Sequence, residues 1–139
     1  MRRSMMRTFL LVLLAALALA PAAAKATKAQ PVEHYVFGTL DTPTPGPVSG
    51  GLLLMGGGDR NIDAMKWFFG KAGNGHIVVI SASYGEEIGQ EFYHDIGGIQ
   101  STEIFVFHAR SQATDKKILA RLRKADGIFI AGGDQSRYV

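Results

Sequence analysis

Residues 77–107 read IVVISASYGEEIGQEFYHDIGGIQSTEIFVF, and this stretch decides the fold. It opens and closes on short, nearly continuous apolar runs, Ile77–Ile80 and Ile104–Phe107, which are typical of strands covered on both faces. Between the two runs, apolar side chains recur at helical spacing, which predicts a helix with one apolar face. These side chains are Ile88, Phe92, Ile96 and Ile99. The order strand, helix, strand predicts two parallel strands joined by a crossover helix.

The same alternation continues outward on both sides. Apolar runs predict two more strands, Leu52–Met55 and Ile128–Ala131, and helical stripes predict two more crossover helices. The stripes are formed by Ile62, Met65, Phe69 and Ala72 in the first helix and by Ile118, Leu119 and Leu122 in the last. Right-handed crossovers place such helices on both faces of the sheet. We therefore expect an α/β fold with three layers, α/β/α, and a doubly wound, mostly parallel sheet.

Polar residues mark where the predicted helices begin, because their side-chain oxygens accept hydrogen bonds from amides of the first turn. The expected caps are Asp59 or Asn61 for the first helix, Ser83 for the second and Thr114 for the third. Asp134 would cap a fourth helix, yet only residues 135–139 follow it, too few for a stable helix. We therefore expect a chain that is cut short after its fourth core strand.

Residues 1–26 have the three-part layout of a secretory signal peptide, with a basic start, an apolar run and a string of small residues. The apolar run, Phe9–Ala20, is about a dozen residues long, whereas a helix that crosses a membrane needs about twenty. The pattern predicts cleavage near Ala24 or Ala26, a secreted or periplasmic mature chain and no stable membrane anchor. A retained anchor is the weaker alternative, and the export route stays open.

Residues 27–50 hold four of the five prolines, with threonine, serine and glycine around them. Such a composition predicts a lead-in segment with at most one short strand, Tyr35–Thr39. The folded domain is therefore expected over residues 51–139.

Composition narrows the class of protein and of chemistry. The 139 residues are 47% apolar and 19% charged, which argues for at most one globular domain and against a disordered, collagen-like or coiled-coil chain. The chain has no cysteine, so disulfides, thiolate metal sites and cysteine nucleophiles are excluded. Four of the 15 basic side chains lie within residues 1–26, so residues 27–139 carry 11 basic and 12 acidic side chains. This balance gives no electrostatic case for nucleic acid binding.

We also expect no cofactor and no metal. The glycine cluster at residues 56–58 lacks the spacing of a dinucleotide fingerprint and the lysine of a phosphate-binding loop. The histidines His34, His76 and His94 show no metal-ligand spacing.

Loops follow the four predicted strands, and ligands bind at the carboxyl ends of strands in open parallel sheets. These loops are residues 56–60, 81–84, 108–111 and 132–135. Glycines in the first and last loops would let backbone amides face a developing negative charge, as an oxyanion hole or a phosphate cradle requires. A purely steric need for glycine after a strand is the ordinary alternative.

Candidate side chains in these loops are few. The weaker candidate site residues are Gly57, Gly58, Asp59 and Ser83. Ser83 matches only half of the Gly-x-Ser-x-Gly nucleophile elbow, because position 81 is serine, and helix capping is its more ordinary role. His108 is a candidate base, although a histidine that is simply hydrogen-bonded at a strand end is more common.

Four segments in one register resemble cyanophycinase and the related aspartyl dipeptidases. They read GLLLMGGGD at residues 51–59, AG at 72–73, IVVISAS at 77–83 and ADGIFIAGGDQ at 125–135. The closing Gly-Gly-Asp-Gln, followed by Arg137, is similar to the cyanophycinase branch, since the dipeptidase branch usually has Asn-Thr after its glycines. The resemblance covers about Gly50 to Tyr138.

The resemblance implies a fold like that of class I glutamine amidotransferases, with serine in place of their cysteine. It implies a serine nucleophile in a Gly-x-Ser-Ala-Gly elbow, followed by a histidine and an acidic partner, all beyond Val139. Within the chain it implies Gly133 as an oxyanion-hole donor and Gln135 as a substrate-binding side chain, with Gly132 and Asp134 shaping the substrate-binding turn. Asp59 departs from the glutamate that the family often has, and residues 81–83 depart from its usual loop.

The first prediction of function is an exported serine-type peptidase that hydrolyses peptide or isopeptide bonds at aspartate, with an aspartate-arginine polymer as one candidate substrate. The chain alone is expected to be inactive, because the elbow is missing from it. The alternative is a non-catalytic remnant that binds a small or peptide ligand at the same sheet edge, and a third option is a decayed gene. The exact substrate, the acidic triad member and the oligomeric state, a homodimer included, stay open.

Overall fold

The computed structural model describes residues 30–41 and 45–138, so the predicted signal peptide lies outside the described residues. The strands are β1 (Glu33–Gly38), β2 (His76–Ser81), β3 (Ser101–Val106) and β4 (Gly127–Ile130). The α-helices are α2 (Ile62–Lys71), α3 (Glu86–Gln90) and α4 (Lys116–Leu122). A π-helix, η1 (Glu91–Ile96), continues α3, and two 3-10 helices are η2 (Arg110–Thr114) and η3 (Gln135–Tyr138).

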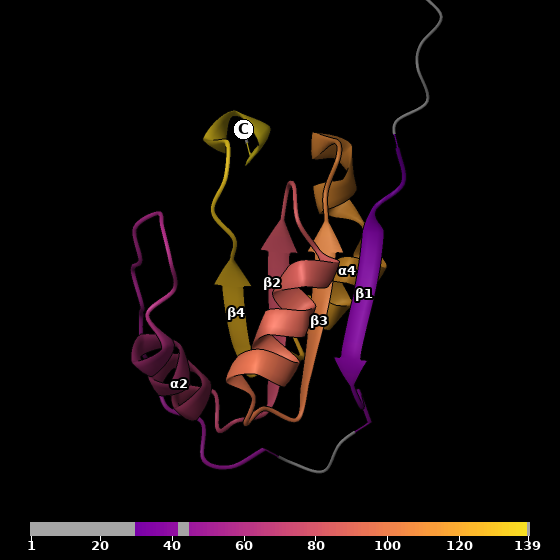
Figure 1. Ribbon diagram of the computed structural model, residues 1–139. Helices are drawn as coiled ribbons and strands as arrows, with labels where there is room; N and C mark the ends of the chain where they lie inside the picture. Colours follow the sequence, from indigo (N-terminus) through magenta and orange to yellow (C-terminus); the bar gives the residue numbers. More distant parts are fainter. Residues whose placement is uncertain (1–29, 42–44, 139) are drawn as a thin grey trace, which may run out of the picture.

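The strands form one sheet in the order β1-β3-β2-β4 (Figure 1). Strand β2 pairs in parallel with β3 on one side and with β4 on the other, whereas β1 is antiparallel to β3. The predicted mostly parallel α/β sheet is confirmed. No helix in the described part of the chain is long and apolar enough to cross a membrane.

Helices cover both faces of the sheet, as the three-layer prediction requires. Met65 of α2, Ile88 of α3 and Phe92 of η1 pack with Ile77 and Ile104 in one apolar cluster. On the opposite face, the buried side chains of a second cluster are Val78, Phe105 and Ile118. Figure 1 shows α3 in front of the strands and α4 behind them.

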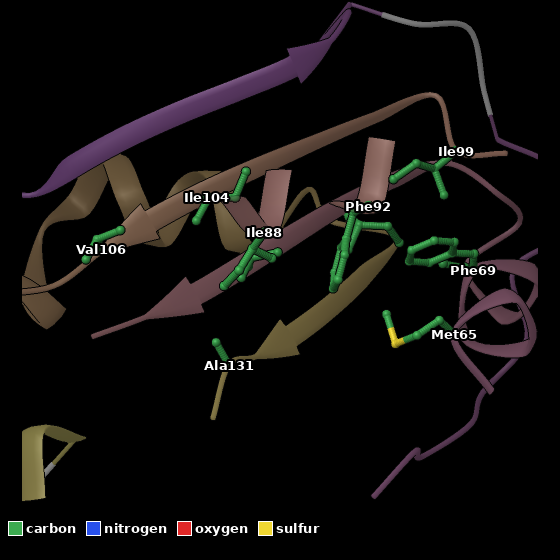
Figure 2. Packing of buried hydrophobic residues seen from close by; sticks show 11 residues of the cluster. Met65, Phe69, Ile88, Phe92, Ile99, Ile104, Val106 and Ala131 are labelled. Atoms are coloured by element: carbon green, nitrogen blue, oxygen red, sulfur yellow. The ribbon is translucent and has the colours of Figure 1, made fainter. Parts of the chain in front are cut away.

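Phe92 lies at the centre of the larger cluster. Its side chain is fully buried, and its ring packs edge-on against Phe69, with 5.4 Å between centroids, and against Phe129 at 5.1 Å. Figure 2 shows Phe92 next to Phe69 and on the same side of the sheet as Ile88. Burying a side chain of this kind stabilises a fold by about 1.5–3 kcal/mol.

Two of the predicted helix starts need correction, and one is confirmed. Asn61 caps α2, because its Oδ1 accepts a hydrogen bond of 3.0 Å from the Ala64 amide. Ser83 does not cap α3, whose cap is Gly85 without a side-chain bond. Thr114 ends η2, and Asp115 caps α4 instead, since its Oδ1 accepts from Lys117 N at 2.7 Å.

The second helical stripe predicts one continuous α-helix, and the structure corrects this. After Gln90 the helix widens into η1, where Gly97 N donates to Phe92 O at 3.1 Å, five residues back. Ile99 lies beyond the helix end but is still buried in the larger cluster. The periodicity therefore located the apolar face correctly and the helix type wrongly.

The predicted strand Leu52–Met55 is not a strand in the described structure. The segment pairs with no described strand, and Leu52 and Leu54 are 78% and 84% exposed. The chain just before it is hydrogen-bonded to the end of α2, through Ser49 N to Lys71 O at 2.8 Å. A strand exists only with a neighbour to complete its ladder, and no described segment pairs with this one.

The lead-in segment contributes more than sequence predicts. Strand β1 starts two residues before the expected Tyr35–Thr39 strand and runs along β3. Its Tyr35 and Phe37 pack against the larger cluster. Glycine at 85 and 89 allows this packing, because a Cβ at Gly89 would lie 2.1 Å from the Phe37 ring.

Candidate functional site

A cavity of about 920 Å³ opens beside the carboxyl end of β4. Segment 51–60 forms one wall, and residues 128–133 form the other. Phe68 and part of the α3 side, namely Tyr84, Glu87, Ile88 and Glu91, complete the lining. The cavity therefore lies at the sheet edge where parallel strands of this architecture place their ligands.

The turn after β4 brings the predicted oxyanion donor to this cavity. Gly132 and Gly133 both line it, and Gly133 has φ +129°, a conformation that favours glycine. No described residue accepts a hydrogen bond from the Gly132 or Gly133 amide. An unpaired, fixed amide can donate to an oxyanion at no reorganisation cost.

Asp134 shapes the turn rather than lining the cavity. Its Oδ1 accepts a hydrogen bond of 3.0 Å from the Ser136 amide at the start of η3. Hydrogen bonding to Ser136 lowers the pKa of Asp134, so the side chain is held as a carboxylate. Gln135 begins η3 directly after it, which fixes the backbone position of the predicted substrate-binding residue.

Ser83 lies beside this turn, although its predicted capping role is wrong. A Cβ added at Gly133 would lie 3.7 Å from Ser83 Oγ. Arg137 joins the two loops, because its Nη1 donates to Ala82 O at 3.2 Å and to Ser83 Oγ at 3.4 Å. Tyr138 Oη also donates to Ala131 O at 2.8 Å, so η3 is anchored at both loops.

The glycine run after residue 55 forms the facing wall. Gly57, Gly58 and Asp59, which the sequence offers as weaker site candidates, all line the cavity. Gly58 has φ +100°, and a Cβ at Gly56, Gly57 or Gly58 would meet nothing within 4 Å. Open space beside these residues leaves room for a ligand.

Arg60 also lines the cavity, and sequence reasoning named it only as the end of the glycine loop. Its Nε donates to Glu91 Oε2 at 2.6 Å, and its guanidinium lies over the rings of Phe92 and Phe129. The signal that could have found it is a cation two residues after a glycine run that follows an apolar segment.

His108 does not join the cavity. Its Nε2 lies 2.9 Å from Glu33 Oε1, and its backbone amide donates to Gln112 Oε1 at 2.8 Å. The hydrogen bond from Tyr35, with a smaller contribution from His108, lowers the pKa of Glu33. His108 therefore joins β1 to the loop after β3.

A buried polar network lies on the α4 face, and sequence reasoning missed it. Glu103 is 1% exposed and accepts from Arg121 Nε at 2.8 Å, while His34 Nε2 and His76 Nε2 lie 2.8 and 3.2 Å from its carboxylate oxygens. Burial alone would raise the pKa of Glu103, but hydrogen bonds from His76, Arg121 and His34 outweigh it and lower the pKa to about 2. The network joins β1, β2, β3 and α4, away from the cavity.

Known cyanophycinases are similar to this chain. The proteins of Trichormus variabilis and of a Nostoc species are each 28% identical to it over 108 residues, covering 71% of this chain and 36% of theirs. The Synechococcus elongatus cyanophycinase is 38% identical over 63 residues, 43% of this chain and 20% of its own length. The chain thus spans about a third of the length of the first two relatives. No family model and no solved structure matches it. The similarity supports a cyanophycinase-like relationship.

Proposed function

We propose that this chain forms the first part of the peptidase domain of an exported, cyanophycinase-like serine peptidase. The whole protein would hydrolyse peptide or isopeptide bonds at aspartate, with an aspartate-arginine polymer as the candidate substrate. The observation that carries the proposal is the turn Gly132–Gln135, where Gly133 lines a cavity at the carboxyl end of β4 and donates its amide to no described residue.

The proposed roles follow from the chemistry of acyl transfer. A serine hydroxyl attacks the scissile carbonyl while the proposed histidine beyond Val139 takes its proton. The carbonyl oxygen becomes negatively charged, and the Gly133 amide donates to that oxygen. The histidine then returns the proton to the amine that leaves as the C–N bond breaks, and water releases the acyl group from the serine. Removing one such donor typically costs about 10²–10³ in kcat. Gln135 would bind the substrate, while Asp134 and Gly132 hold the turn in shape.

The nucleophile is proposed to lie in the part of the whole protein that follows Val139. The 139 residues contain no Gly-x-Ser-x-Gly sequence, and the first two relatives are about three times as long as the matched stretch. We therefore expect the chain on its own not to hydrolyse peptides. Residues 1–26 are proposed to export it, which would suit degradation of a polymer outside the cell.

The charges of the cavity support an aspartate-arginine substrate. Arg60 offers a positive group, while Asp59, Glu87 and Glu91 offer negative ones in the same lining. A unit that carries one carboxylate and one guanidinium would match both signs.

The test begins with the DNA that follows the Val139 codon. An open frame that continues into a strand and a Gly-x-Ser-x-Gly elbow would support the proposal, and a stop codon there would oppose it. The whole reading frame should then release soluble products from the aspartate-arginine polymer or from aspartyl peptides. Replacing the elbow serine by alanine should abolish turnover, and retained turnover would rule out the serine mechanism.

A second candidate function is binding without catalysis. The cavity is present, and no described residue accepts from the Gly132 or Gly133 amide, so these amides could bind a ligand without a nucleophile beside them. Titration calorimetry of the chain with aspartyl peptides separates the two functions. Binding together with a genuine stop codon after Val139 would favour the module, and the absence of heat at millimolar peptide would remove it.

A further inference from the structure

We propose that Arg60 is the carboxylate-binding residue of the cavity and that it selects acidic peptides over their amidated counterparts. The inference rests on the proposed function, because it names the side chain that would recognise the aspartyl substrate. It assigns to Arg60 a role in specificity and not in bond cleavage.

Arg60 is held in place before any ligand arrives. Its side chain is 23% exposed, and its Nε donates to Glu91 at 2.6 Å. The guanidinium carbon lies 5.3 Å from the centre of the Phe92 ring and 5.1 Å from that of Phe129. Both rings belong to the larger apolar cluster, so the guanidinium is packed against a rigid surface. The Arg60 side chain would therefore lose little conformational entropy when a ligand binds.

The bond to Glu91 leaves the guanidinium's outer edge available. Glu91 engages Nε, and no described residue accepts a hydrogen bond from Nη1 or Nη2. A guanidinium presents its donors as a planar fork that matches the two oxygens of a carboxylate. Glu91 thus orients the group, and the remaining donors suit a ligand.

Hydrogen-bond donors and space favour a carboxylate next to Arg60. Arg60 is the single cation among the described residues that line the cavity, and the acidic Asp59, Glu87 and Glu91 line it too. A carboxylate would therefore bind through the Nη donors that no described residue engages, and not through the overall charge of the cavity. The space next to it is open, because Gly56, Gly57 and Gly58 have no side chains and a Cβ on any of them would meet nothing within 4 Å. Gly133 lines the same cavity, so a peptide bound through Arg60 would share that cavity with the proposed oxyanion donor.

Two carboxylates of a peptide could bind Arg60, an aspartyl side chain or a carboxyl terminus. Three probes distinguish them by titration calorimetry with the 139-residue chain. N-acetyl-aspartyl-alanine amide carries only the side-chain carboxylate, N-acetyl-asparaginyl-alanine carries only the terminal one, and N-acetyl-asparaginyl-alanine amide carries neither. We expect the first probe to bind about tenfold or more tightly than the third, as expected when a charge-assisted hydrogen bond is lost. A preference for the second probe would move the recognised group to the carboxyl terminus.

Arg60→Gln should remove this preference, so that the first and third probes bind alike. Arg60→Lys keeps the charge without the fork and should bind the first probe less tightly than the native chain but more tightly than Arg60→Gln. The matched control is Arg123→Gln, which removes an exposed guanidinium after α4 that does not line the cavity. Far-UV circular dichroism checks that each variant is folded, and if Arg60→Gln is not, the Lys variant decides.

The proposal is overturned if the native chain binds none of the probes at millimolar concentration, if it binds all three equally, or if Arg60→Lys matches the native chain. These outcomes are separate from the failure of the proposed function. If the longer protein has no peptidase activity, the proposed function is wrong. If Arg60→Gln abolishes the preference for the carboxylate probe, Arg60 is still established as the carboxylate-binding residue.

Discussion

Arg137 Nη1 lies 3.2 Å from the carbonyl oxygen of Ala82, so the turn after β4 is joined to the loop after β2. The bond crosses 55 residues of sequence and ends beside Ser83 and the Gly132–Gly133 turn. The position of the proposed oxyanion donor therefore depends on a side chain that does not itself line the cavity.

Arg137→Ala should loosen this turn while leaving the fold intact. In the whole protein we expect kcat/KM for aspartyl peptides to fall by about tenfold or more, which corresponds to about 1.4 kcal/mol of transition-state stabilisation. Because Arg137 is exposed, the thermal midpoint should hardly change. Arg110→Ala, which removes an exposed arginine from η2, is the control and should leave kcat/KM unchanged.

Gly133→Ala tests the conformation of the donor. The backbone at φ +129° strains any other residue, and relief of that strain would turn the amide away from the cavity. We expect kcat to fall by about 10²-fold, as for the loss of one oxyanion donor. The control is Gly98→Ala. Gly98 also has a positive φ, +84°, and a Cβ there would meet nothing within 4 Å, so alanine is strained by the backbone alone. Gly98 does not line the cavity. Equal losses of kcat in the two variants would contradict the role of Gly133.

Gln135→Ala tests the proposed substrate contact. We expect KM for aspartyl peptides to rise in the whole protein, while the free energy of unfolding of the chain stays within about 0.5 kcal/mol of the native value. Steady-state kinetics and urea unfolding give the two quantities. An unchanged kcat/KM would remove Gln135 from the site.

Glu103→Gln should destabilise the chain by about 3 kcal/mol at neutral pH, because hydrogen bonds to a buried charged group are lost or weakened. Urea unfolding followed by circular dichroism measures this difference. Glu86→Gln changes an exposed glutamate at the start of α3 and should have little effect. A loss as small as that of the control would mean that the network does not stabilise the fold.

The Glu103 carboxylate also makes the stability of the chain depend on pH. The pKa of Glu103 is lowered from 4.5 to about 2 in the folded chain, so its contribution is present above the unfolded pKa and is lost as the pH falls from 4.5 towards 2. The stability difference between the native chain and Glu103→Gln should therefore be constant above pH 5 or so and shrink below pH 4.5. Urea unfolding at a series of pH values tests this. A difference that grew on acidification would have the wrong sign.

Local patterns predicted most of the sheet and of its covering layers. Apolar runs located β2, β3 and β4 to within three residues. Strands β2 and β3 are buried on both faces, which favours long apolar runs, whereas β4 is apolar although Ile128 and Ile130 are exposed. Helical stripes located α2 and α4, because the side of each helix that packs on the sheet needs apolar residues at helical spacing. Glycines after β4 also pointed to the cavity, since a turn with positive φ excludes most other residues.

The features that sequence did not predict depend on distant partners. Leu52–Met55 has a strand's sequence, yet its state depends on a neighbouring strand, which no local pattern contains. Glu103 lies in the middle of a strand only because His34, His76 and Arg121 converge on it from three other elements. Arg60 became a candidate only when Glu91 and two aromatic rings were placed around it.

The Glu103 network also constrains how this sequence can change over generations. Its donors reach the carboxylate from positions 69, 27 and 18 residues away, so each belongs to a different element. A neutral residue at position 103 would leave Arg121 and two histidines without the carboxylate that accepts their hydrogen bonds. Loss of any one donor would leave the desolvation cost of the buried carboxylate less well offset. Among descendants of this gene, His34, His76, Glu103 and Arg121 should therefore be inherited or replaced as a set, and an isolated exchange at Glu103 should be rare.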